Sequence, residues 1–214
     1  MLKVICWITQ DIGRRNTNTD GKDAMTKQDE LLKFVEDNLI NACIMLQRNI
    51  HYKDLSEDER NNYIYDILSA AGRYKGIHIE GQAQQGKSES GKQAGELDII
   101  VKYKENPGSI VEAMNLKSVL KKRISSHIEK LFGYDTAGNP VNYVISYVNV
   151  KNFEKFWIKY KGYIKSCDYK YHLVSVNENV GLNFIYSDIK CLSATHRRNG
   201  REVSVVHIAV RMME

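Results

Sequence analysis

The sequence lacks several patterns that would assign it to a common functional class. Its four cysteines, Cys6, Cys43, Cys167 and Cys191, lie far apart and form no CxxC or Cys/His cluster, so we expect neither a zinc site nor a disulfide framework. The six histidines are scattered, and no Walker A or GxGxxG motif occurs. These absences argue against a nucleophilic triad, a P-loop NTPase and a dinucleotide-binding enzyme.

Long apolar runs are also missing. No stretch reaches the roughly 18 apolar residues that a transmembrane helix needs. The start, MLKVICWITQ, has too short an apolar run for a signal peptide and no small-residue cleavage site. We therefore expect a cytoplasmic protein without a membrane partner. The 214 residues suit one large domain or a small domain with an added module. We divide them into an N-terminal arm and helix over 1–50 and a second unit over 51–214.

Basic residues exceed acidic ones, and the formal net charge is +5. Lys and Arg are interleaved with aromatic residues in SVLKKRISSHIEK and EKFWIKYKGYIKSCDYKYH, a pattern that nucleic-acid-binding surfaces often show. Lysines that merely solvate helix faces would produce the same pattern. The charge is therefore compatible with a polyanionic partner and does not establish one.

Helical spacing of apolar residues predicts four helices. The first covers about 27–48, and the second begins at Ser56, where Glu59 completes a capping-box signature, and ends near Gly72. Ser118 is the expected cap of a third helix. The fourth has an aromatic face that indicates core packing, made of Phe153, Phe156, Trp157, Tyr160 and Ile164.

Strand patterns fill the intervals between these helices. Three strands, in GIHIEGQAQQG, ELDIIVKY and IVEAMNL, follow one another with short connections and should be antiparallel neighbours. VNYVISYVNV follows a helix and should lie parallel to the third strand. The end of the chain predicts a β-hairpin that turns at Asn199-Gly200. The fold class is therefore α/β, in the order α-β-β-β-α-β, with a central mixed sheet, an N-terminal helical segment and a C-terminal hairpin.

Acidic residues interrupt the apolar runs of the second and third predicted strands. Glu96 and Asp98 share one face of their strand, and Glu112 lies inside the next. If a bulge or bend brings the acids together, their mutual repulsion would favour a divalent cation with oxygen ligands. The alternative is that Glu96 and Asp98 only mark a solvated strand start.

The element order and the acids on two successive strands resemble the PD-(D/E)XK nuclease superfamily. AGELDIIV is similar to the strand that carries the family's Asp, and IVEAMNLKS to the following Glu strand. The stretch looks most like the Mrr-like, restriction-endonuclease-like domains of prokaryotic defence proteins, over about residues 55–160. The resemblance implies a restriction-endonuclease-like core and a Mg²⁺-dependent (or Mn²⁺-dependent) endonuclease that cuts double-stranded DNA as the cutting module of a defence or restriction system.

The resemblance also implies roles for individual residues. Asp98 becomes the central metal ligand, Glu112 the second, and the Ala113 carbonyl a third, with Glu96 as a further candidate. Glu57, on the helix before the first strand, matches an acid that many members carry. A solvated first-turn acid would account for Glu57 equally well.

The family's lysine is not at its usual place. Two residues after Glu112 the chain has Met114, and the nearest candidate is Lys117, which would act on water or on the charge of the transition state. Lys117 is equally well explained as a surface lysine. Asn115 has the wrong strand parity for the site and is expected to be structural.

Further residues are candidates for contacts to nucleic acid. Glycines in QAQQGKSESGKQAG leave backbone amides open to phosphates, although a hairpin needs no such function. The candidates are Gln82, Gln84, Lys87, Ser90, Lys121 and Lys122.

Two other functions stay open. The first is a catalytically inactive nuclease fold that binds nucleic acid or a partner protein, which Met114 favours. The second is a metal-dependent hydrolase of RNA or nucleotides. A nuclease of this length has little room for its own target reader, so we expect a homodimer or a larger effector complex.

Overall fold

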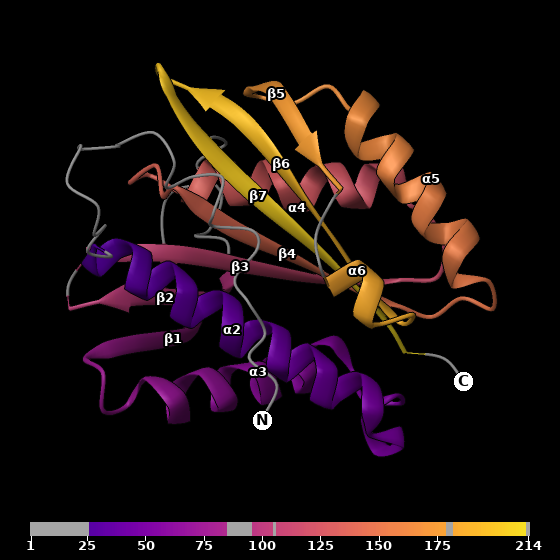
Figure 1. Ribbon diagram of the computed structural model, residues 1–214, viewed down its shortest axis with the longest axis horizontal. Coiled ribbons are helices and arrows are strands. Elements are labelled where there is room, and N and C mark those ends of the chain that lie inside the picture. The colour runs from indigo at the N-terminus through magenta and orange to yellow at the C-terminus, as the bar shows by residue number, and fades with distance from the viewer. Residues whose placement is uncertain (1–25, 85–95, 105, 179–181, 213–214) are drawn as a thin grey trace.

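The computed structural model describes residues 26–84, 96–104, 106–178 and 182–212 of the chain. In chain order the elements are α2 (Lys27–Arg48), the 3-10 helix η1 (Ile50–Tyr52), α3 (Glu57–Gly72), β1 (Ile77–Gln84), β2 (Glu96–Tyr103), β3 (Asn106–Leu116), α4 (Lys121–Tyr134), β4 (Val141–Val148), α5 (Phe153–Ser166), β5 (His172–Asn177), α6 (Leu182–Ile185), β6 (Ile189–Arg198) and β7 (Arg201–Arg211). The described strands form one seven-stranded mixed sheet between helices, so the protein is of the α/β class (Figure 1). None of the described helices is long and apolar enough to cross a membrane.

The helix starts follow local capping, with one exception. At α3, Ser56 and Glu59 form the predicted capping box, in which each side chain accepts the other residue's backbone N–H. Thr26 begins α2 with a second capping box that the sequence analysis missed. The prediction that Ser118 caps α4 is wrong. The Leu120 N–H donates to the Ser118 carbonyl, and this turn leaves Leu120 as the residue before the helix, without a side-chain cap.

The strand order is β1-β2-β3-β4-β7-β6-β5. β1, β2 and β3 pair antiparallel, and β3 then pairs parallel with β4 after the crossover through α4. Both the three-strand meander and the parallel fourth strand are therefore confirmed. The carboxyl ends of β3, β4 and β7 lie at one edge of the sheet, because these three strands run in the same direction.

The C-terminal hairpin is confirmed and forms part of the same sheet. Asn199 and Gly200 have φ angles of 48° and 80°, the left-handed backbone that a two-residue hairpin turn requires. β7 pairs parallel with β4, so the hairpin extends the central sheet, and β5 closes its far edge against β6. The sequence analysis did not predict β5.

Helices cover both faces of the sheet and define two hydrophobic cores. α2 and α3 pack on one face, where Val35, Leu39 and Ile64 meet the inward residues of the strands. α4 and α5 pack on the other face, and the aromatic stripe of α5 lies in this core as predicted. The helix of the predicted N-terminal segment therefore shares a core with the sheet.

Candidate active site

One extra residue in β3 sets the register between the strands that carry Asp98 and Glu112. Lys102 pairs with Pro107, whereas the neighbouring Val101 pairs with Ser109. This shift of one residue leaves Gly108 unpaired in a β-bulge. The register is then even as far as the pair of Ile99 and Val111, the neighbours of Asp98 and Glu112. A register slip of one residue turns a side chain to the opposite face. The bulge therefore influences how the two acids are placed relative to each other.

A glycine at the bulge also allows α2 to lie close to β3. A Cβ atom on residue 108 would stand 2.4 Å from Cδ2 of Leu31, a buried residue of α2. A larger residue at this position therefore requires Leu31 to move. The packing of α2 and the placement of the acid pair depend on the same position.

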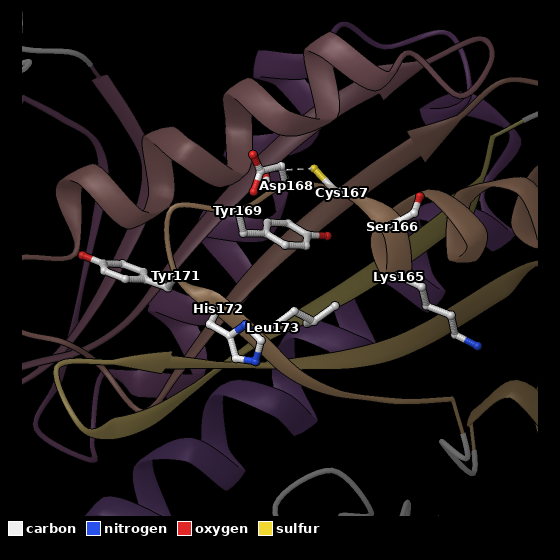
Figure 2. A pocket seen from close by; sticks show the side chains of 8 residues that line it. All are labelled: Lys165, Ser166, Cys167, Asp168, Tyr169, Tyr171, His172 and Leu173. Atoms are coloured by element: carbon white, nitrogen blue, oxygen red, sulfur yellow. Dashed lines mark hydrogen bonds between the residues drawn. The ribbon is translucent and has the colours of Figure 1, made fainter.

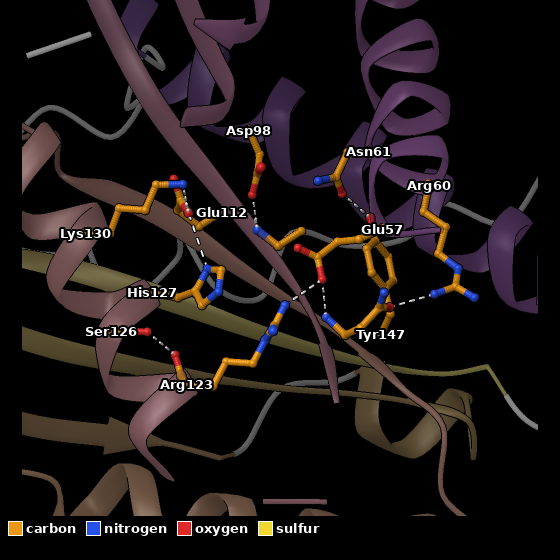
Figure 3. A network of polar contacts seen from close by, with 12 residues as sticks. Glu57, Arg60, Asn61, Asp98, Glu112, Arg123, Ser126, His127, Lys130 and Tyr147 are labelled. Atoms are coloured by element: carbon orange, nitrogen blue, oxygen red, sulfur yellow. Dashed lines mark hydrogen bonds and ion pairs between the residues drawn. The ribbon is translucent and has the colours of Figure 1, made fainter. Parts of the chain in front are cut away.

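Asp98 lies at the point where β2 and β3 separate. Its Oδ2 accepts the Ala113 N–H at 2.7 Å (Figure 3). Burial, and after it the charge of Glu112, raises the pKa of Asp98 to about 6, and the hydrogen bond from the Ala113 N–H opposes this shift. Since the N–H and C=O of a strand residue point to the same side, the Ala113 carbonyl is also directed toward Asp98.

Glu112 is a fully buried carboxylate that faces α4. Its Oε2 lies 2.9 Å from Lys130 Nζ and 3.4 Å from His127 Nδ1, and its exposed fraction is 0% (Figure 3). The Lys130 contact is an ion pair. Neither oxygen of Glu112 has a hydrogen-bond partner among the described residues. The Lys130 ammonium is therefore the counter-ion of this buried carboxylate.

Glu57 reaches β3 from the first turn of α3, but not at Glu112. Its Oε2 accepts the Asn115 N–H at 2.6 Å and contacts Arg123 Nη2 of α4 at 2.9 Å. Its charge also contributes to the raised pKa of Asp98. The structure therefore places Glu57 at Asn115 of β3, where it links α3, β3 and α4.

Buried polar contacts hold this end of β3. Arg60 donates to the Asn115 side chain at 2.7 Å and to the Tyr52 carbonyl, and its guanidinium lies over the ring of Tyr147. The Tyr147 hydroxyl donates to Asn61 at 2.9 Å. Asn115 has the structural role expected from its strand parity. These contacts fix the strand that carries Glu112.

Neither Met114 nor Lys117 supplies a charge next to Glu112. Met114 is completely buried in the core beneath α4 and α5. Lys117 is exposed just beyond the end of β3, and Lys121 and Lys122 are exposed in the first turn of α4. The ammonium beside Glu112 comes from Lys130, which the sequence analysis did not single out.

His127 and Lys130 had a sequence signal that was not used. The buried face of α4 contains Ile124, Ile128 and Leu131. His127 is three residues after the first of these and four before the last, so it faces the sheet by helical spacing. Lys130 lies three residues further along the same side.

Some predicted site residues lie outside the described part of the structure. These are Lys87 and Ser90 as whole residues, and the side chains of Gln82, Gln84 and Glu96. In the described ranges, no three His, Cys, Asp or Glu side chains are grouped so that they could hold a metal ion. Asp98 is turned to the Ala113 amide, whereas Glu112 is turned to α4, and the candidate site therefore consists of two neighbouring acids.

A separate hollow lies between the end of α5 and the start of β5. It is lined by Lys165, Ser166, Cys167, Asp168, Tyr169, Tyr171, His172 and Leu173 (Figure 2). None of the predicted site residues lines it. Its charged groups are of both signs, and Lys165 is paired with Glu178. The acid pair therefore stays the stronger candidate for a catalytic centre.

Comparisons with known proteins do not assign the chain. A scan against protein-family models finds no matching family, and searches of curated proteins and of solved structures find no match either. The function is therefore inferred from the residues and their geometry.

Proposed function

We propose that the protein is a metal-dependent nuclease that hydrolyses phosphodiester bonds of DNA, with a restriction-endonuclease-like arrangement of its core. The α-β-β-β-α-β order of α3, β1, β2, β3, α4 and β4 supports this proposal. So does the position of the two acids, one on each of the second and third strands. The resemblance of these strands to the PD-(D/E)XK superfamily supplies the reaction class.

The observation that carries the proposal is the state of Glu112. Glu112 is fully buried on the strand beside that of Asp98, and its counter-ion is the partly exposed ammonium of Lys130, which a divalent cation would displace. Asp98, Glu112 and the Ala113 carbonyl would hold Mg²⁺ or Mn²⁺. When bound, such an ion activates water and neutralises charge that develops on a phosphoryl group.

Lys130 is the best candidate for the missing lysine. Its ammonium already lies 2.9 Å from Glu112 Oε2 and is partly exposed. A bound cation would take over the neutralisation of Glu112, and the flexible Lys130 side chain would then be free to contact phosphate oxygens. This assignment replaces Lys117, which stays a weaker candidate because it is exposed beyond the end of the strand.

Basic side chains near the site suit a polyanionic substrate. Lys121, Lys122 and Arg123 form the first turn of α4, and Arg123 contacts Glu57 beside the acid pair. Phosphate contacts from such residues would position the backbone of DNA without selecting a sequence. Lys121 and Lys122 therefore keep their proposed role in nucleic-acid binding.

Plasmid cleavage with matched variants tests the proposal. Wild-type protein with Mg²⁺ or Mn²⁺ should cut DNA, whereas Asp98→Ala and Glu112→Gln should not, because a neutral group is a poor ligand for a hard cation. Glu129→Gln, which removes an exposed acid of α4, is the control and should cut normally. Equal cleavage by wild type and Asp98→Ala would refute the site.

An inactive nuclease fold that binds nucleic acid is the second candidate. The Lys130–Glu112 ion pair favours it, because the buried acid already has an internal counter-ion. This candidate predicts DNA binding without cleavage and no stabilisation by Mg²⁺ or Mn²⁺. Parallel digestion of matched RNA and DNA substrates separates the remaining alternative, an RNA-directed hydrolase.

A further inference from the structure

The segment between α5 and β5 belongs to the second basic and aromatic stretch of the sequence, and the proposed active site does not use it. This segment contacts the β6–β7 hairpin, whose tip projects at the end of the sheet (Figure 1). The guanidinium of Arg198 lies 5.2 Å from the ring centroid of Tyr171, and the Lys170 ammonium lies 6.0 Å from the same centroid. One aromatic ring therefore brings cations of two separate segments together.

The strand register adds further basic side chains at the same place. Arg198 pairs with Arg201 across the hairpin turn, and Arg197 pairs with His172 of β5. The side chains of Arg197 and Arg201 are exposed. We call this group the hairpin patch, and it consists of Lys170, Tyr171, His172, Arg197, Arg198 and Arg201.

The hairpin patch has more cations than acids. Glu202 pairs with Arg197 at 3.6 Å, and Asp135 pairs with Arg198 at 3.2 Å. Asp168 lines the neighbouring hollow and is a third acid nearby. The four Lys and Arg side chains of the hairpin patch still outnumber these acids. The excess of positive charge suits a polyanionic partner.

Arg198 fixes the hairpin patch to α4. Its side chain is only 13% exposed, and its partner Asp135, the residue after α4, is buried. Asp135 also accepts backbone N–H groups of the turn that follows it, so its position is determined by several contacts. Since α4 also carries Lys130 beside Glu112, the hairpin patch and the acid pair are held by one helix.

The hairpin patch lies within the length of a short duplex from the acid pair. Glu112 is aligned through Val144 with His207 of β7, and Arg201 precedes His207 by six residues. At about 3.3 Å per residue, this separation is about 20 Å along the strands. The same length corresponds to about six base pairs of B-form DNA. One DNA molecule can therefore contact both places, and the hairpin patch is too far away to act on the bond that is cut.

We propose that the hairpin patch is a second DNA-binding surface, which holds the phosphate backbone of a duplex bound at the acid pair. This inference deepens the proposed function and rests on its DNA substrate. Arginine forms bidentate hydrogen bonds with phosphate oxygens. Contacts of this kind position the duplex and carry no sequence information. The hairpin patch therefore contributes affinity and leaves the chemical step unchanged.

The experiment measures binding of the full chain to a fluorescein-labelled DNA duplex by fluorescence anisotropy, over a range of salt concentrations and with a chelator present. The Arg197→Gln and Arg201→Gln double variant should lower the slope of log affinity against log salt concentration by about two. Its affinity near 0.15 M salt should fall by about 10- to 30-fold. With Mg²⁺ and saturating protein, its single-turnover cleavage rate should equal that of wild type.

The matched control is the Lys155→Gln and Lys159→Gln double variant. It removes two exposed charges from α5, in the same basic and aromatic stretch, and should bind DNA like wild type. If the hairpin variant does not fold, Lys170→Gln takes its place, with an expected decrease in slope of about one.

Each other result decides a defined part of the reasoning. Equal binding by wild type and the hairpin variant overturns the second surface and leaves the proposed nuclease intact. Equal losses in the hairpin variant and the control also overturn it, because net charge and not this surface would then determine the affinity. Weaker binding by the hairpin variant, without cleavage by wild type, supports the surface and refutes the nuclease. Absence of DNA binding by wild type refutes both.

Discussion

Replacing Asp98 by asparagine should make the metal-free protein more stable at neutral pH. Burial, and after it the charge of Glu112, raises the pKa of Asp98 from 3.8 to about 6. Because the pKa is higher in the folded state, folding favours the protonated carboxyl group. That stabilisation is complete below a pH of about 3.8 and is lost as the pH rises through about 6.

The magnitude follows from the size of the pKa shift. A difference of about two pKa units corresponds to about 3 kcal/mol between the protonated and the charged side chain. Asp98 is partly exposed, and its charged form accepts a hydrogen bond from Ala113 that an asparagine accepts more weakly. We therefore expect Asp98→Asn to raise the free energy of unfolding by about 1–2 kcal/mol at pH 7.5, or about 2–4 °C in Tm for each kcal/mol.

The assay is urea unfolding of wild type and variant at pH 7.5 and pH 4, with a chelator present. The difference between the two proteins should be clear at pH 7.5 and should nearly vanish at pH 4, where Asp98 is protonated in the folded state. Asp66→Asn, on the exposed side of α3, is the control and should show little difference at either pH. A variant that is less stable than wild type at pH 7.5, or a difference independent of pH, would refute the reasoning.

Three further predictions test other parts of the structure. Lys130→Gln should lower the single-turnover cleavage rate by about 10² to 10³-fold with little change in DNA affinity, whereas Lys117→Gln should change neither quantity. The reverse result would make Lys117 the lysine that acts in cleavage. Gly108→Ala should lower the free energy of unfolding by about 1–3 kcal/mol, because its Cβ would meet Leu31. In denaturation experiments, the effect of the Gly108→Ala and Leu31→Ala double variant should differ strongly from the sum of the two single effects. Burial lowers the pKa of His207 to about 3, so its contribution to stability is present above about pH 6.5 and is lost as the pH falls toward 3. His207→Gln should therefore show a flatter dependence of unfolding free energy on pH, and an unchanged dependence would contradict the assigned burial effect.

Most of the fold was predictable because local signals agreed with the tertiary structure. Capping at Ser56 and the turn at Asn199-Gly200 are determined by neighbouring residues, so sequence alone suffices for them. β5 was not placed, because an edge strand is half exposed and carries little of the apolar alternation that marks a buried strand. Pairing of β7 with β4 depends on distant contacts and was likewise not predictable.

The acid pair was predictable only in outline. Sequence places Asp98 and Glu112 on successive strands, but whether they share a face depends on one residue of register. That residue is Gly108, and a glycine near a strand connection indicates a turn as readily as a bulge. The close approach of Leu31 from α2, which makes a small residue necessary there, is a tertiary fact.

Lys130, whose ammonium lies beside Glu112, was not predicted, because a lysine was sought only on the strand that carries Glu112 and just after it. A buried carboxylate interacts with whichever ammonium is near in space, and the parallel crossover through α4 returns the helix over β3. Lys130 is 18 residues from Glu112 in the sequence but 2.9 Å from it in the structure. Met114 fills the core beneath α4 and α5, and the charge next to Glu112 comes from the helix and not from the strand.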